Sequence, residues 1–361
     1  MGYMLSKEAF NKVLSRLGES FLLYSPVRKV GEGCYTDVDV VRYDYVKSLD
    51  EIELGTKSNY AFKELLTPLS QTLFFFTENE TKEADDETRD VIVFLRSCDM
   101  HAVKRLDAIY LENKFADPFY ERIRKRVRFA LIGCGHSFEN CFCVSMKSNV
   151  TSEGYLFSVD YDSANDVVSC DVKDEDVAKL FEAAGATAAE VVPLSVTENA
   201  TKVTVPAAVP NTIYKDHLWD EYTSRCIKCG RCNFVCPTCT CYTMQDIFYT
   251  DNGRVGERRR VASSCMVDGY TNVAGGGEYR RTNGERMRFK VLHKIYDFRK
   301  RFGYDMCVGC GRCDDVCPEY ISFANIINKV NAAAEKEAAE EAAAASAASD
   351  GAVKEGGARN G

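Results

Sequence analysis

Two short cysteine-rich segments constrain this chain more than any other feature of its sequence: CIKCGRCNFVCP at 226–237 and CVGCGRCDDVCP at 307–318. Both have the form C-x2-C-x2-C-x3-C-P, and they are called box 1 and box 2 below. Cysteines at intervals of three allow a tight loop to wrap its thiolates around one small inorganic object. Gly230 and Gly311 relieve crowding where the backbone approaches that object. The closing prolines fix the onward direction of the chain.

The spacing of the boxes is that of ferredoxins, in which three cysteines of a run bind one [4Fe–4S] cluster and the fourth binds the other cluster. The sequence therefore predicts two clusters with crossed ligands, and it predicts that the boxes are neighbours in space. Zinc held by the CxxC pairs is the alternative, but four regular cysteines followed by proline, occurring twice, favour iron–sulfur. The expected ligands are Cys226, Cys229, Cys232 and Cys317 for cluster 1, and Cys307, Cys310, Cys313 and Cys236 for cluster 2.

The cysteine count also bears on the compartment. The chain has 17 cysteines among 361 residues, and its N-terminus does not have the pattern of a signal peptide. Metal ligands and buried thiols are therefore expected rather than disulfides, in the reducing cytoplasm. No run of about 18 apolar residues is present, so no membrane span is predicted. The formal net charge of −8 disfavours a general nucleic-acid binder.

The sequence leaves the roles of the other cysteines open. Cys239 and Cys241 follow box 1 and are interpreted either as further ligands or as side chains lining the cluster pocket, and Cys265 as packing. A second group, of four cysteines and one histidine in the N-terminal half, has three possible interpretations: a metal site, a substrate or cofactor pocket at strand ends, or small side chains that pack in the core. Its members are Cys98, Cys134, Cys141, Cys143 and His136. Because no Ser-His-Asp or paired-carboxylate arrangement can be placed, no catalytic residue is predicted.

The expected fold class is α+β, with three regions. A mixed α/β domain is expected at 1–215, a two-cluster domain at 216–331, and an Ala/Glu-rich tail at 332–361 that is disordered or partly helical. Within the first domain, the stretch 89–110 predicts a buried strand, a turn and a helix. Residues 1–21 predict an amphipathic helix.

The segment between the boxes carries many basic residues. They either stabilise a reduced, anionic cluster and attract an acidic partner, or they form a solvated face. Residues 286–302 predict a basic amphipathic helix. Its apolar side is Met287, Val291, Leu292, Ile295 and Phe298.

A resemblance to the iron–sulfur electron-transfer subunit of the bacterial anaerobic sulfite reductase is carried by CNFVCPTCTCYTMQDIFYTDNGRVGERRRV and by the stretch from SCMVDGYTNVAGGGEYRR to CPEYISF. In the N-terminal half, ELLTPLSQTLFFF, FLRSCDMHAVKRLD and NCFCVSM are similar to the same family and to the related beta subunits of sulfhydrogenases. The resemblance covers nearly all of residues 1–331. It implies a helical-ferredoxin arrangement, in which helices separate the boxes and the eight box cysteines bind the clusters.

The resemblance also implies two partner subunits, one that binds flavin and NAD and one that contains sirohaem. Together with this chain they reduce sulfite to sulfide. The expected function is therefore that of a non-catalytic electron conduit between these partners. One alternative is an iron–sulfur beta-type subunit of a hydrogenase- or sulfhydrogenase-like or other oxidoreductase complex, with a cofactor site in the N-terminal domain. Another is a zinc-stabilised interaction module.

Overall fold

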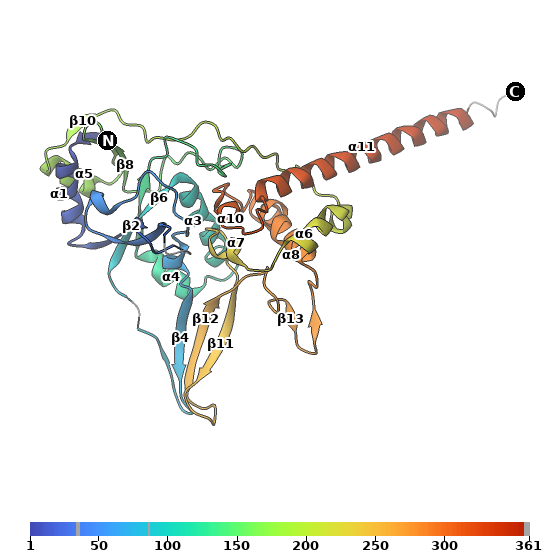
Figure 1. Cartoon of the computed structure of the whole chain (residues 1–361), viewed down its shortest axis with the longest axis horizontal. Coiled ribbons are helices and arrows are strands. Elements are labelled where there is room, and N and C mark those ends of the chain that lie inside the picture. Colours follow the sequence, from blue (N-terminus) through green and yellow to red (C-terminus); the bar gives the residue numbers. More distant parts are fainter. Residues whose placement is uncertain (34–36, 86, 357–361) are drawn as a thin grey trace.

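The structure is a computed structural model that describes residues 1–33, 37–85 and 87–356. Figure 1 shows a block of helices and strands, an arm of long strands that projects from the block, and a long C-terminal helix, α11, that points away from it. The boxes lie in the block, near the point where the arm and α11 leave it.

A mixed eight-stranded sheet forms the first part of the block, with strand order β10-β1-β9-β8-β7-β6-β2-β3. The four strands β2, β6, β7 and β8 are parallel, and antiparallel strands extend the sheet at both edges. The strand and the helix predicted within 89–110 are confirmed as β6 and α3, but α3 follows β6 directly, without the predicted turn. The strands are β1 (Gly2–Leu5), β2 (Phe21–Lys29), β3 (Val40–Val46), β6 (Asp90–Arg96), β7 (Val127–Ile132), β8 (Phe157–Asp162), β9 (Val167–Asp171) and β10 (Thr187–Ala189).

Alternation along β6 divides the core between the two faces of this sheet. Ile92 and Phe94 pack with α1 and α5 on one face, whereas Val93 and Leu95 pack with α3 and α4 on the other. Val308 and Cys310 of box 2 join this second cluster, so the sheet itself positions box 2. The helical segments of this part are α1 (Lys7–Leu17), η1 (Leu49–Glu51), α2 (Lys63–Leu66), α3 (Ser97–Tyr110), α4 (Pro118–Lys125) and α5 (Glu175–Ala183).

The N-terminal helix is shorter than predicted. It begins at Lys7, and the Ser6 hydroxyl caps it by accepting a hydrogen bond from the Ala9 N–H at 3.3 Å. The residues before Ser6 form β1 because they pair with β9 on one side and β10 on the other. Strand pairing at both edges therefore overrides the helical pattern of the first residues.

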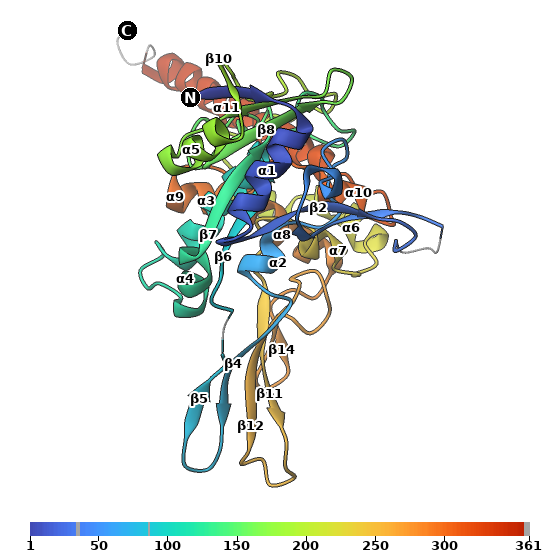
Figure 2. The same ribbon diagram turned by 90° about the vertical axis from the view of Figure 1, so that its left-hand side faces the viewer.

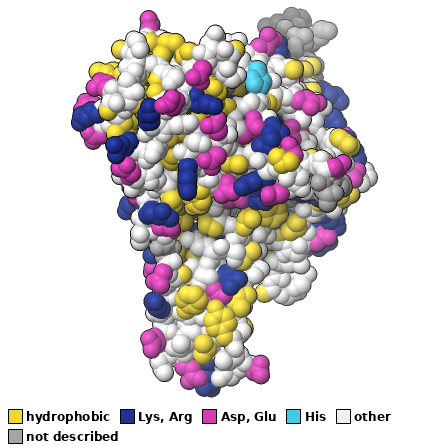
Figure 3. Space-filling model, turned by 60° about the vertical axis from the view of Figure 1, so that its left-hand side comes forward, with side chains coloured by type: hydrophobic (Ala, Val, Ile, Leu, Met, Phe, Trp, Pro, Cys, Tyr) yellow, Lys and Arg dark blue, Asp and Glu magenta, His cyan; other side chains and the backbone are white. Residues whose placement is uncertain are grey.

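The arm is a four-stranded antiparallel sheet with strand order β11-β12-β4-β5. Figure 2 shows that β4 and β5, from the first half of the chain, lie beside β11 and β12, from between the boxes. The arm sheet therefore contains strands from both sides of the domain boundary that was expected at residues 215/216. Figure 3 shows hydrophobic side chains on the arm, where Phe75, Met244 and Phe248 are exposed. The arm strands are β4 (Ser70–Phe76), β5 (Thr81–Glu83), β11 (Tyr242–Phe248) and β12 (Gly256–Ala262).

The basic helix predicted at 286–302 is confirmed, with one π-helical turn in its middle, and its five apolar side chains are all buried. The segment between the boxes is nevertheless not purely helical, since β11 and β12 and a small hairpin precede α8. The remaining elements are η2 (Asn211–Lys215), η3 (His217–Trp219), α6 (Asp220–Arg225), α7 (Arg231–Phe234), β13 (Asn272–Val273), β14 (Gly277–Glu278), α8 (Asn283–Leu292), η4 (His293–Asp297), α9 (Phe298–Phe302), α10 (Arg312–Asp315) and α11 (Phe323–Gly356).

Helix α11 extends through most of the Ala/Glu-rich tail, and residues 357–361 of that tail lie outside the described residues. Within the described part of the chain, no helix combines the length and the apolar character needed to cross a membrane.

Candidate iron–sulfur site

Boxes 1 and 2 have the same local backbone. Gly230 and Gly311 are left-handed, with φ of 73° and 71°, and each precedes a one-turn helix, α7 or α10. Two residues earlier, Lys228 and Gly309 also have positive φ, 62° and 64°. Helices α7 and α10 pack against each other. The repeat in the sequence is thus a repeat in the structure, and the boxes are neighbours in space.

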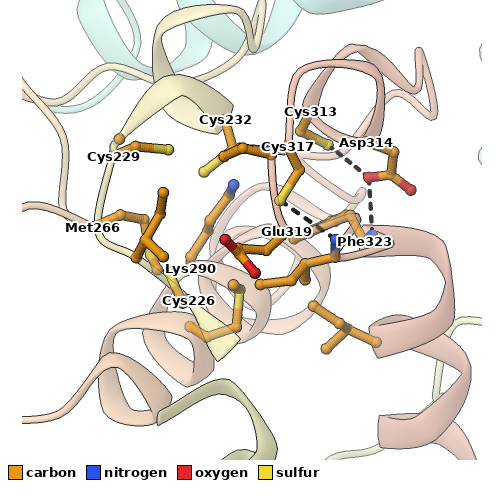
Figure 4. A pocket seen from close by; sticks show the side chains of 16 residues that line it. Cys226, Cys229, Cys232, Met266, Lys290, Cys313, Asp314, Cys317, Glu319 and Phe323 are labelled. Atoms are coloured by element: carbon orange, nitrogen blue, oxygen red, sulfur yellow. Dashed lines mark hydrogen bonds between the residues drawn. The ribbon is translucent and has the colours of Figure 1, made fainter. Parts of the chain in front are cut away.

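Thiols of both boxes line a first cavity of about 40 Å³. In Figure 4 the sulfurs of Cys229, Cys232 and Cys317 face the same space, and the Lys290 ammonium points into it. The cysteines on its walls are Cys226, Cys229 and Cys232 from box 1 and Cys313 and Cys317 from box 2.

A second cavity of about 20 Å³ adjoins the first and shares Cys232, Cys313 and Lys290 with it. The cysteines on its walls are Cys232 and Cys236 from box 1 and Cys307, Cys310 and Cys313 from box 2. An all-sulfur donor set of this kind fits the ligand chemistry of [4Fe–4S] clusters. Among the described residues, no three or more His, Cys, Asp or Glu side chains converge closely enough to hold a single metal ion.

Burial makes the thiols of box 2 hard to ionise. It raises the pKa of Cys307 to about 12 and that of Cys310 to about 11. Iron binds the thiolate form, so a site built from these cysteines needs compensating positive charge nearby.

Lys290 and Lys294 bring positive charge to the cavities from α8 and η4, and both side chains are buried. Burial alone lowers the pKa of Lys290, but the adjacent Cys232 sulfur and its neighbours outweigh burial and raise the pKa well above its ordinary value. The same balance, with Cys236 as the leading partner, raises the pKa of Lys294. The Lys294 ammonium also donates a hydrogen bond to the Thr238 hydroxyl at 2.8 Å. Both lysines are therefore cations beside the cysteine sulfurs.

Arg312 anchors box 2 to the N-terminal half of the chain. Its two terminal nitrogens each donate to one carboxylate oxygen of Asp99 at 2.7 Å. Its Nε donates to the Ser58 carbonyl at 2.9 Å. The side chains of Arg312 and Asp99 are 1% and 0% exposed, so the pair is fully desolvated. Arg231, at the matching position of box 1, is exposed.

The backbone of residues 140–143 packs directly on the glycines of box 2. The Phe142 N–H donates to the Gly309 carbonyl at 2.8 Å. A Cβ on Gly309 would lie 2.6 Å from the Phe142 carbonyl, and a Cβ on Gly311 would lie 2.3 Å from the Asn140 carbonyl oxygen. Both positions therefore require glycine, for their positive φ and for the close approach of another backbone.

The N-terminal cysteines lie partly around this contact. Cys141 and Cys143 are buried on either side of Phe142, and the Cys141 thiol donates to the Cys310 carbonyl at 3.5 Å. Cys98 is the second residue of α3, where burial raises its pKa well above the ordinary value. These contacts are those of buried thiols that pack against box 2, which is one of the three roles that the sequence leaves open.

Two lysines of the N-terminal half also reach the boxes, and the sequence does not predict this. Lys57 donates to the Cys310 carbonyl at 3.1 Å and pairs with Asp315 at 2.6 Å. Lys63, which is buried, donates to the carbonyls of Asn233 and Cys239 at 2.9 and 3.0 Å. Neither lysine belongs to a motif identified in the sequence, and the tertiary fold brings both to the boxes.

The basic residues between the boxes fall into two sets. Lys290 and Lys294 lie at the cavities, as described above. The arginines of β12 instead belong to the arm, where Arg258 pairs with Asp246 at 2.7 Å and Arg260 pairs with Asp117 at 2.5 Å. Of these two arginines, Arg258 is exposed, as a solvated face requires, whereas Arg260 is buried.

Comparison with known proteins adds three findings. Residues 225–321 match the family model of a 4Fe-4S dicluster domain, which places such a domain in the C-terminal part of a mixed α/β chain. The chain is 30% identical over 346 residues to the beta subunit of sulfhydrogenase 2 of Pyrococcus furiosus, an alignment that covers 90% of this chain and 97% of the relative. No solved structure matches the chain.

Proposed function

Because the chain belongs to the same family as the beta subunit of sulfhydrogenase 2, we propose that it is an iron–sulfur electron-transfer subunit of a larger oxidoreductase complex. Two [4Fe–4S] clusters would supply one-electron transfer. The proposed ligands are Cys226, Cys229, Cys232 and Cys317 for one cluster, and Cys307, Cys310, Cys313 and Cys236 for the other.

One observation carries this proposal: three thiols of one box and the closing thiol of the other box meet on the walls of each cavity. The dicluster-domain match over residues 225–321 supports the same cofactor type. Because the cavities share Cys232 and Cys313, the two clusters would be close enough for electrons to pass between them. The chain's own residues would bind the clusters, and Lys290 would offset negative charge between them.

The proposal is tested on full-length protein purified without oxygen. We expect at least about eight irons and eight acid-labile sulfides per chain, brown colour, and an EPR signal from interacting centres after dithionite reduction. Colourless protein without inorganic sulfide, or protein that contains only zinc, would contradict the proposal and would favour the zinc-stabilised module instead.

The reaction of the whole complex is a finer question. The relative found is a sulfhydrogenase subunit, so we propose a hydrogenase- or sulfhydrogenase-like complex as the setting. The sulfite reductase assignment, with its flavin-binding and sirohaem-containing partners, depends on the sequence resemblance alone. No contact of the described residues favours sulfite chemistry.

The two settings are separated by isolating the native complex through a tag on this chain under anaerobic conditions. In a sulfhydrogenase-like complex, H2 reduces the clusters and sulfite does not reoxidise them. Sirohaem absorption in the isolated complex, together with reoxidation of the clusters by sulfite, would instead support the sulfite reductase assignment.

A further inference from the structure

A third cavity, of about 200 Å³, adjoins the second and is the largest of the three. It shares Lys290 and Lys294 with the second cavity. Three cysteines outside the boxes and one histidine lie on its walls. They come from three separate segments and are Cys239, Cys241, Cys265 and His293.

Two of the three sulfurs of this cavity, those of Cys241 and Cys265, accept hydrogen bonds from groups that surround it. Asn233 lies inside box 1 and is 1% exposed. Its side-chain amide donates to the Cys265 sulfur at 3.1 Å and reaches the Cys241 sulfur at 3.8 Å. Tyr270 also hydrogen-bonds to Cys241. Donors directed at sulfur suit thiolate ligands, and such hydrogen bonds are one means by which proteins adjust iron–sulfur clusters.

The third cavity is also connected to the boxes through a hydrogen bond between cysteines. Cys239 hydrogen-bonds to Cys236, which is a proposed ligand at the second cavity. On the far wall, the His293 ring stacks on Phe289 with centroids 5.5 Å apart. Within the part of the chain that the structure describes, no hydrogen bond engages the His293 ring, so its nitrogens are available to a ligand.

We propose that this third cavity binds a further [4Fe–4S] cluster, with Cys239, Cys241, Cys265 and His293 as its ligands. Histidine is an established substitute for cysteine at iron–sulfur centres. The inference depends on the proposed function for its setting, but it uses none of the eight box cysteines. Lys290 and Lys294, placed between the second and third cavities, would offset the negative charge of both clusters.

Two rival roles for the same residues have different chemistry. A Cys3His set can bind one zinc ion in a tetrahedral site, but these four side chains would first have to move closer together, because no such group of described residues converges on a single ion. Cys241 and Cys265, which hydrogen-bond to each other, could instead form a disulfide upon loss of two protons and two electrons to a thiol oxidant. Both roles leave the iron content at the value set by the boxes alone.

The test compares the full-length protein with the double variant Cys241→Ala/Cys265→Ala, both reconstituted anaerobically with iron and sulfide. We expect about twelve irons per chain in the wild type and about eight in the variant, with the box signals retained in EPR spectra. Cys170→Ala, a substitution of a buried thiol in the eight-stranded sheet, is the matched control and should keep about twelve. Circular dichroism checks that each variant is folded.

A second variant keeps the inference testable if the double variant does not fold. His293→Cys should retain about twelve irons and lower the potential of one centre only, because histidine ligation raises the potential. About eight irons in the wild type, zinc in the cavity, or a Cys241–Cys265 disulfide found by mass spectrometry would overturn the inference. The function proposed for the boxes would survive these outcomes, whereas protein without iron would remove both proposals.

Discussion

Arg312 of box 2 and Asp99 of α3 form a fully buried, bidentate ion pair, with both nitrogen–oxygen distances at 2.7 Å. The pair joins the second cysteine box to the eight-stranded sheet through the first turn of the helix that follows β6. It is one of several contacts that hold the box fold and the N-terminal half in one block. Removing one partner leaves the other charge buried without compensation.

We therefore expect Arg312→Met to destabilise the holoprotein by about 3–5 kcal/mol, the usual cost of breaking a buried pair. The measurement is the urea midpoint of anaerobic holoprotein, followed by circular dichroism. Arg231→Met is the matched control, because Arg231 occupies the same box position and is exposed. Equal midpoints for the two variants would show that the pair does not hold the halves together.

Lys290 should raise the reduction potential of the clusters, since a buried cation favours the form with the extra electron. Lys290→Met is expected to lower at least one midpoint potential by on the order of 50–150 mV, from a screened charge interaction across a few ångströms. The check is an EPR-monitored redox titration. Lys300→Met, which removes an exposed lysine of the same helical region, should leave the potentials unchanged.

Gly309 is needed for close contact as well as for its backbone angle. Gly309→Ala should destabilise the second site, because the new Cβ would meet the Phe142 backbone at 2.6 Å. Gly303→Ala is the control, since Gly303 has φ of +84° and open space around its Cα. Both variants carry the left-handed strain, and Gly309→Ala should cost about 1–3 kcal/mol more from overpacking. Thermal melts of the two holoproteins measure that difference.

The stability of the block should depend on pH through His101. Burial lowers the pKa of His101 in the folded state, and nearby Arg105 and Lys104 add to this effect. Its stabilising contribution is therefore complete above the unfolded pKa, about 6.5, and is lost as the pH falls through the folded value. His101→Gln should lose less stability than the wild type between pH 7 and pH 5. Parallel urea curves at several pH values would reveal whether the two proteins differ.

The sequence predicts the chemistry of the site better than its surroundings. The shared cysteine spacing of the boxes predicts their shared backbone conformation. The apolar periodicity of residues 286–302 predicts which side of that helix is buried. β12 is different, because its central run of three arginines belongs to the basic segment, for which the sequence predicts no strand. It becomes a strand through ladder hydrogen bonds to β4 and through ion pairs such as Arg258–Asp246.

Other features depend on contacts between distant residues and leave no local pattern. Lys63 lies in a short helix whose sequence does not indicate that its ammonium is buried against box 1. Asp99 reads as an ordinary residue in the first turn of a helix, and its partner lies in box 2. Cys265 is interpreted from the sequence as packing, and only the fold brings it to the same cavity as Cys241.

The crossed pairing of the boxes is the central claim, and EPR spectroscopy of single cysteine variants tests it most directly. Cys317→Ser, although in box 2, should alter the same centre as Cys229→Ser and leave intact the centre altered by Cys310→Ser. Cys236→Ser should show the converse. If Cys317→Ser instead alters the centre that Cys310→Ser alters, each box holds its own cluster, and the crossed arrangement is contradicted.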